Sequence, residues 1–200
     1  MPARKTDSCP PLPRPQCPLA GFPLDYSYKE VRTVAGFLDD DPYTGVAKGM
    51  DRSSLPKGAE VNATGVRLAN NMLESLDGLA DFLERVLDDP LELRWLDLSN
   101  NRLTTVDPVL LDYPKLSCLY LQGNKIAKLS DIEALAAAPA LSKITAQGNP
   151  CQQKKDYRLR VAAALPRLRS LDVIAVTKED RARADAYAHV RAERLRRENM

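Results

Sequence analysis

The sequence predicts an α/β solenoid, in which short parallel strands stack into one sheet and helical or irregular segments return along the convex side. Two observations predict this fold. A pattern of apolar residues with one asparagine recurs four times, and successive asparagines are 30, 23 and 25 residues apart. Between the copies, the apolar residues change from alternation to helical spacing. We expect about five strands, a helical cap at the N-terminal end and a helix at the C-terminal end.

The four copies have apolar residues at their first, fourth, sixth and eleventh positions and an asparagine at the ninth. They are residues 63–73 (ATGVRLANNML), 93–103 (LRWLDLSNNRL), 116–126 (LSCLYLQGNKI) and 141–151 (LSKITAQGNPC). This is the L-x-x-L-x-L-x-x-N-x-L pattern of leucine-rich repeats. Alternation turns the leucines of each strand to one face, and stacking of neighbouring copies buries that face.

The asparagine of each copy follows the strand, where the chain turns away. A side-chain amide both donates and accepts, so it can pair with the backbone of two adjacent turns that would otherwise be buried unpaired. We therefore predict a structural ladder rather than a binding site for Asn71, Asn101, Asn124 and Asn149.

The segments between the strands show helical spacing of apolar residues. It predicts three return helices, at residues 77–89, 130–138 and 152–165. Pro90 and Pro139 end the first two, because proline disrupts a helix interior. A last strand, in LPRLRSLDVI, has no asparagine after it and ends the series.

The chain divides into four segments by composition. They are a proline-rich extended tail at 1–21, an N-terminal cap helix and loop at 22–58, repeats with a C-terminal cap at 59–177, and a charged helix at 178–200. In the second segment, Ser27 and Glu30 have capping-box spacing. An apolar stripe from Tyr28 to Leu38 then predicts a helix that covers the first repeat.

Charge and hydropathy exclude several function classes. The 29 Lys and Arg residues nearly balance 27 Asp and Glu residues, a formal net charge of +2. A chain this close to neutral lacks the strong positive electrostatic field that direct binding to nucleic acids or anionic membranes uses. No apolar run approaches the about 18 residues of a membrane span, and the N-terminus lacks the apolar core of a secretory signal. We expect a cytoplasmic protein.

Catalytic and metal-binding patterns are absent from the sequence. It contains no nucleotide-binding glycine loop, no HExxH and no GxSxG. The four cysteines form no CxxC pair, and the single histidine, His189, lies in the predicted surface helix. We predict a protein that is not an enzyme and that uses no cofactor, metal or small-molecule ligand.

A partner is therefore expected on the concave face, where alternation exposes every second strand residue. The candidate partner-binding residues are Arg67, Trp95, Asp97, Tyr120, Gln122, Lys143 and Thr145. Trp95 and Tyr120 lie on adjacent strands, about 4.8 Å apart, and can form one aromatic patch. Trp, Tyr and Arg dominate protein-binding hot spots. Two interpretations of Trp95 stay open: contact with a partner, and cover by another part of the chain.

Segments beyond the bare repeats carry a family resemblance. They are PLDYSY (23–28), DPYTG (41–45), LRWLDLSNNRLTTVDPVL (93–110), LYLQGN (119–124) and LRSLDVIAVTKEDR (168–181). The chain resembles the leucine-rich repeat-containing protein 51 family, within a short class that includes a phosphatase-regulatory protein and the U2 A-prime subunit. The resemblance spans about residues 23–181. It implies a non-catalytic protein associated with ciliated organisms.

Three functions compete at this stage. The favoured one is a structural or adaptor subunit of a ciliary or flagellar axoneme, with axonemal proteins as partners. The second is a phosphatase regulatory subunit that binds through the concave face, with binding that survives deletion of both tails. The third is a subunit of a nuclear RNA–protein particle, without direct RNA contact because the net charge is nearly neutral.

Overall fold

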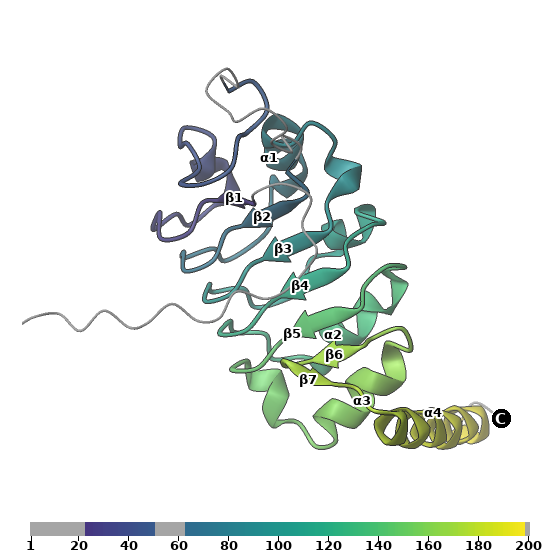
Figure 1. Ribbon diagram of the computed structural model, residues 1–200. Helices are drawn as coiled ribbons and strands as arrows, with labels where there is room; N and C mark the ends of the chain where they lie inside the picture. The colour runs from purple at the N-terminus through teal and green to yellow at the C-terminus, as the bar shows by residue number, and fades with distance from the viewer. Residues whose placement is uncertain (1–22, 51–62, 199–200) are drawn as a thin grey trace, which may run out of the picture.

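The computed structural model of the chain describes residues 23–50 and 63–198. Within them, seven strands form a single sheet in the order of the sequence, from β1 to β7 (Figure 1). The strands are β1 (Leu24–Asp25), β2 (Gly65–Arg67), β3 (Trp95–Asp97), β4 (Cys118–Tyr120), β5 (Lys143–Thr145), β6 (Ser170–Leu171) and β7 (Ile174–Ala175). Pairing is parallel from β1 to β6 and antiparallel between β6 and β7.

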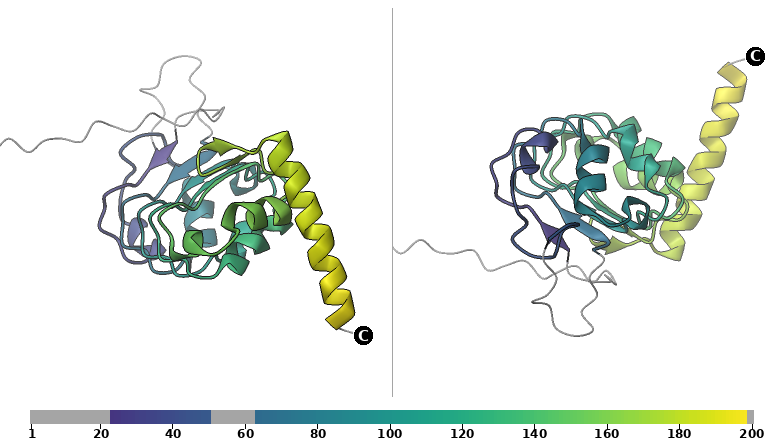
Figure 2. Two further views of the ribbon diagram at one scale, coloured as in Figure 1. Left: turned by 90° about the horizontal axis from the view of Figure 1, so that it is seen from below. Right: turned by 90° about the horizontal axis from the view of Figure 1, so that it is seen from above.

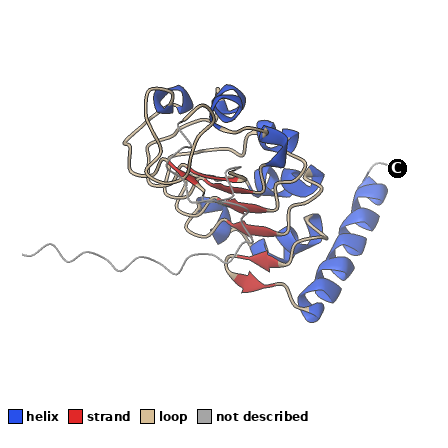
Figure 3. Ribbon diagram, turned by 45° about the horizontal axis from the view of Figure 1, so that its top comes forward, coloured by secondary structure: helices blue, strands red, loops and turns tan. Residues whose placement is uncertain are grey.

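Short helices return the chain between strands, and they lie together on one side of the sheet (Figure 3). The α-helices are α1 (Leu79–Val86), α2 (Leu129–Ala134), α3 (Tyr157–Ala164) and α4 (Lys178–Glu198). The 3-10 helices are η1 (Val34–Phe37), η2 (Pro90–Glu92), η3 (Pro108–Asp112), η4 (Leu135–Ala137) and η5 (Pro150–Gln153). The predicted leucine-rich repeat solenoid is confirmed.

The core consists of aligned apolar residues, one from the centre of each repeat. Six of these residues are in register across β1 to β6, and each is at most 1% exposed: Leu24, Val66, Leu96, Leu119, Ile144 and Leu171. Their neighbours in sequence point to the opposite face of the sheet, as the two-residue period of a strand requires. The sheet therefore has one buried face and one face that can carry polar side chains.

Helix α1 forms where the sequence predicts the first return helix. Leu79, Phe82, Leu83 and Val86 are its buried residues, at helical spacing. Phe82 packs edge-on against Tyr26, with ring centroids 5.2 Å apart. The helix thus joins the N-terminal segment to the first repeat.

The N-terminal cap differs from the helix predicted there. A strand, β1, adds to β2 in parallel, and only the single turn η1 follows it. The hydroxyl and N–H of Ser27 bond Asp25 Oδ1 instead of capping a helix. Tyr28 and Glu30 have φ values of +59° and +56°, which a right-handed helix does not contain. The segment therefore caps the sheet as an extra half-repeat.

The other end of the sheet carries two more features. Strand β7 forms a hairpin with β6, and together with β1 it gives the sheet seven strands rather than about five. Helix α4 follows, with Ala184 buried against the body. Beyond that contact, α4 projects away from the repeats in both views of Figure 2. No helix in the described residues is long and apolar enough to cross a membrane. The proline-rich tail at 1–21 and part of the 22–58 segment lie outside the described residues.

Candidate functional site on the concave face

We use "concave face" for the side of the sheet that points away from the return helices. The strand register arranges its side chains in two rows. The first row is Gly65, Trp95, Cys118, Lys143 and Ser170. The second row is Asp25, Arg67, Asp97, Tyr120 and Thr145. Six of the seven predicted partner-binding residues stand in these rows, and Gln122 follows two residues after Tyr120.

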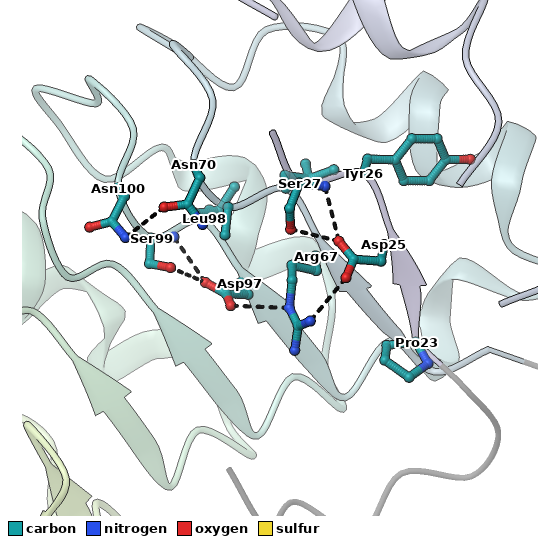
Figure 4. A network of polar contacts seen from close by, with 12 residues as sticks. Pro23, Asp25, Tyr26, Ser27, Arg67, Asn70, Asp97, Leu98, Ser99 and Asn100 are labelled. Atoms are coloured by element: carbon teal, nitrogen blue, oxygen red, sulfur yellow. Dashed lines mark hydrogen bonds and ion pairs between the residues drawn. The ribbon is translucent and has the colours of Figure 1, made fainter. Parts of the chain in front are cut away.

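Arg67 bridges two aspartates, one on each neighbouring strand (Figure 4). Its Nη1 lies 3.0 Å from Asp25 Oδ2, and its Nε lies 3.5 Å from Asp97 Oδ2. The second oxygen of each carboxylate is held by a serine two residues later. Ser27 Oγ donates to Asp25 and Ser99 Oγ donates to Asp97, both at 2.6 Å. Both carboxylates and the guanidinium are therefore fixed before any partner arrives.

The electrostatics of this cluster come from partial burial. Burial raises the pKa of Asp97 above its ordinary value, although the hydrogen bonds from Ser99 and the charge of Arg67 favour the ionised form. With both carboxylates ionised, the two aspartates and one arginine carry one net negative charge. The cluster thus offers a partner both a fixed cation and a fixed anionic edge.

Trp95 lies at the centre of the face and is 1% exposed. The guanidinium carbon of Arg67 lies 5.2 Å from its ring centroid, and the Tyr120 ring lies 5.8 Å away at an interplanar angle of 65°. Of the two interpretations left open, burial within the chain describes Trp95 in this structure. Its indole N–H is buried as well.

The remaining predicted residues vary in exposure. Thr145 is buried, and its hydroxyl donates to Gln122 Oε1. Lys143 and Tyr120 are half-buried, and burial raises the pKa of the Tyr120 phenol. The accessible groups of the face are therefore parts of Arg67, Asp97, Tyr120, Gln122 and Lys143.

Asn101 shows how the four asparagines are used. Its Nδ2 donates to Leu68 O at 2.9 Å and to Leu98 O at 3.0 Å, and its Oδ1 accepts from Leu73 N–H at 3.1 Å. One side chain thus joins three backbone groups from two successive repeats. These groups would otherwise be buried without partners.

The other three asparagines repeat this arrangement. Asn71 accepts from Lys29 N–H, Asn124 from Leu103 N–H and Asn149 from Ile126 N–H. Each also donates to carbonyls of its own turn and of the preceding one. All four side chains therefore make hydrogen bonds to the backbone of their own and of neighbouring repeats.

Asp25 and Ser27 belong to the site, and sequence reasoning missed them. The signal was present, because LDYS at 24–27 matches LDLS at 96–99 within the second copy. In both segments the aspartate accepts from the serine N–H and hydroxyl. The duplicated Asp-x-Ser pair is what gives Arg67 two carboxylates to bridge.

The chemistry of the face is that of recognition by hydrogen bonds, ion pairs and aromatic contact. Within residues 23–50 and 63–198, no three metal-ligating side chains are grouped as a metal site would require. Cys151 is fully buried, and burial raises the pKa of its thiol, which makes it a poor nucleophile.

Comparison with known proteins places these features in a family. The model of the leucine-rich repeat family matches residues 58–198. Leucine-rich repeat-containing protein 51 of Rattus norvegicus is 38% identical over 165 residues, covering 82% of this chain and 84% of the rat protein. The Homo sapiens protein of that name is 36% identical with the same coverage.

A solved structure is also similar. In the crystal structure of the Drosophila melanogaster SNF/U2A' complex, one chain is 31% identical to this chain, with a TM-score of 0.54. The match covers 62% of this chain and 67% of that chain.

Proposed function

The chain belongs to the leucine-rich repeat-containing protein 51 family, and from this premise we propose that it is a non-catalytic protein-binding subunit of a ciliary or flagellar axoneme. Leucine-rich repeats are protein-interaction modules, and the concave face is where this chain presents charged and aromatic groups. The proposal assigns partner contact to the accessible part of that face.

The observation that carries the proposal is the fixed cluster around Arg67. Two carboxylates and an indole ring hold its guanidinium, and both carboxylates are held in turn by serines. Preorganised side chains lose little conformational freedom on binding. Arginine beside aromatic residues is also the composition found at binding hot spots.

Two further features support a place in a large assembly. Helix α4 projects from the repeats with most of its surface exposed, so it can contact a second neighbour (Figure 2). The axonemal location in this proposal rests on the family resemblance, because that family is associated with ciliated organisms.

A subunit of an RNA–protein particle is the second candidate. It is favoured by the 31% identity to a chain of the Drosophila melanogaster SNF/U2A' complex. This chain would then bind its protein partner through the concave face without contacting RNA. The two candidates share a mode of binding and differ in the compartment.

Fractionation of ciliated cells that carry the tagged chain tests the proposal. The tagged protein should stay with detergent-extracted axonemes after a high-salt wash. A concave-face variant, Tyr120→Ser with Lys143→Glu, should move to the soluble pool. The matched control, Tyr28→Ser with Arg32→Glu, also replaces one tyrosine and reverses one positive charge, at exposed positions outside the two rows, and should stay with the axoneme.

Each part of the proposal can fail separately. A wild-type protein found wholly in the soluble pool overturns the axonemal assignment. Recovery with a nuclear particle instead supports the second candidate. Equal release of both variants would place the contact outside the concave face.

A further inference from the structure

A groove of about 730 Å³ lies at the C-terminal end of the solenoid, away from the concave-face cluster. Its walls come from three segments: residues 139–142 before β5, residues 166–169 before β6, and residues 176–181 at the start of α4. The first two segments meet because β5 and β6 are parallel and begin at the same edge of the sheet. Strand β7 runs antiparallel to β6 and returns the chain to that edge, where α4 begins. The groove is thus built by the last repeat and the C-terminal cap together.

The charge of the groove is one-sided. Four cationic side chains line it, Arg167, Arg169, Lys178 and Arg181, and no aspartate or glutamate is among the described residues of its lining. This contrasts with the whole chain, whose 29 basic residues nearly balance 27 acidic ones. On α4, Asp180 lies outside this lining and forms an ion pair with Arg158 at 2.8 Å.

The four cations divide into two anchored and two available ones. Arg167 donates to Pro139 O, and Arg181 donates to Leu165 O and Leu168 O at the end of α3. Arg169 and Lys178 are exposed, and neither has an ion-pair partner within residues 23–50 and 63–198. The two hydrogen-bonded guanidinium groups fix the shape of the groove wall, and Arg169 and Lys178 can bind an anionic group.

An apolar hollow continues the groove. It measures about 330 Å³ and is lined by residues 135–138, by Leu141 and by Leu165, with Pro139, Pro166 and Arg167 common to both cavities. Because the two hollows share these residues, one extended ligand can fill both. Such a ligand needs acidic groups at one end and an apolar side chain beside them.

We propose that this groove binds an acidic segment of a partner protein, with an apolar side chain of that segment in the adjoining hollow. Charge complementarity selects the acidic residues, and the alanine, leucine and proline lining selects the apolar one. This surface is separate from the concave face, so the proposal does not rest on the function proposed above.

Fluorescence anisotropy on the full chain tests the groove. The probe is a labelled ten-residue peptide with two leucines flanked by four glutamates on each side. We expect it to bind, and we expect Arg169→Glu with Lys178→Glu to weaken binding at least tenfold. The control pair, Arg196→Glu with Arg197→Glu, changes the net charge equally at the exposed end of α4 and should leave the affinity within twofold.

Two more measurements complete the test. Replacement of both leucines of the peptide by serine should weaken binding, because the apolar hollow is then empty. Thermal unfolding must show that both double variants remain folded, and Arg169→Gln with Lys178→Gln serves if charge reversal unfolds the chain.

Three outcomes overturn the proposal. One is an equal loss of affinity in both charge-reversal pairs, which would reflect net charge alone. The second is unchanged binding in the groove variant. The third is a single-stranded RNA oligonucleotide whose binding, unlike that of the peptide, depends on Arg169 and Lys178.

Discussion

The guanidinium of Arg67 lies over the indole ring of Trp95, with its central carbon 5.2 Å from the ring centroid. The same guanidinium is bonded to Asp25 and Asp97, so the two carboxylates fix the cation over the ring. A cation over tryptophan contributes about 0.5–2 kcal/mol, more when it is desolvated. The ionic network and the aromatic pair of Trp95 and Tyr120 are therefore one cluster.

We predict that Trp95→Ala lowers the free energy of unfolding by about 3 kcal/mol, because a buried indole is replaced by a cavity. Trp95→Phe should cost less, since a ring still faces Arg67 and Tyr120. Urea denaturation measures both. If Trp95→Ala unfolds at the wild-type urea concentration, the indole is not part of the packed structure.

Asn101→Ala should also destabilise the chain, by about 3 kcal/mol, because it leaves three backbone groups buried and unpaired. The control is Asn100→Gly at the adjacent exposed residue. Its backbone has a φ of +53°, which glycine adopts without strain, so a change of about 0.5 kcal/mol or less is expected. Calorimetry measures the melting temperatures of both variants. If Asn101→Ala melts at the wild-type temperature, the hydrogen bonds of Asn101 do not stabilise the fold as predicted.

The repeats could be predicted because four leucine positions and one asparagine recur at fixed places. Each repeat position has the same structural role in every copy, so the local sequence pattern and the overall fold are consistent. The residue before each ladder asparagine shows the same agreement: Asn70, Asn100, Gly123 and Gly148 all have positive φ values. Asparagine and glycine are the residues that adopt this conformation most readily.

The N-terminal cap and the exposure of Trp95 could not be predicted in the same way. The apolar residues from Tyr28 to Leu38 fit a helical stripe, but Leu24 and Tyr26 fill core positions of a half-repeat and decide the local structure. Strand alternation assigns Trp95 to the correct face but says nothing of what packs on that face. Exposure there depends on tertiary contacts.

The close contact between Asn100 and Gly123 gives a further prediction. A Cβ on Gly123 would lie 2.2 Å from Asn100 Oδ1, and the residue has a φ of +70°. Gly78 has a φ of +79° with nothing within 4 Å of its Cβ position. Gly78→Ala should therefore lower the free energy of unfolding by about 1–2 kcal/mol through backbone strain alone. Gly123→Ala should lower it further, because the clash with Asn100 adds to the strain.

A second change separates strain from the clash at Gly123. Asn100→Gly removes the side chain that a Cβ at position 123 would meet. The double variant, Gly123→Ala with Asn100→Gly, should recover stability relative to Gly123→Ala alone in urea denaturation. No recovery would mean that backbone strain, rather than the clash, accounts for the loss.

The start of α4 should respond to acid through Asp180. The hydrogen bond from Arg158, and then that from the Thr177 N–H, hold the pKa of Asp180 below its ordinary value. A lowered folded-state pKa stabilises the chain above the ordinary aspartate pKa, and this contribution is lost as the pH falls through the lowered value. Below about pH 4, attachment of the first turn of α4 to α3 should weaken.

NMR of the Thr177 amide reports this titration, because the amide donates to Asp180 Oδ2 at 3.1 Å. We expect its chemical shift to change with a midpoint below the ordinary aspartate pKa. Arg158→Gln removes the main cause of the shift, so the midpoint should rise toward the ordinary value. Asp180→Asn should abolish the transition, and a transition that persists in Asp180→Asn would assign it to a different carboxyl group.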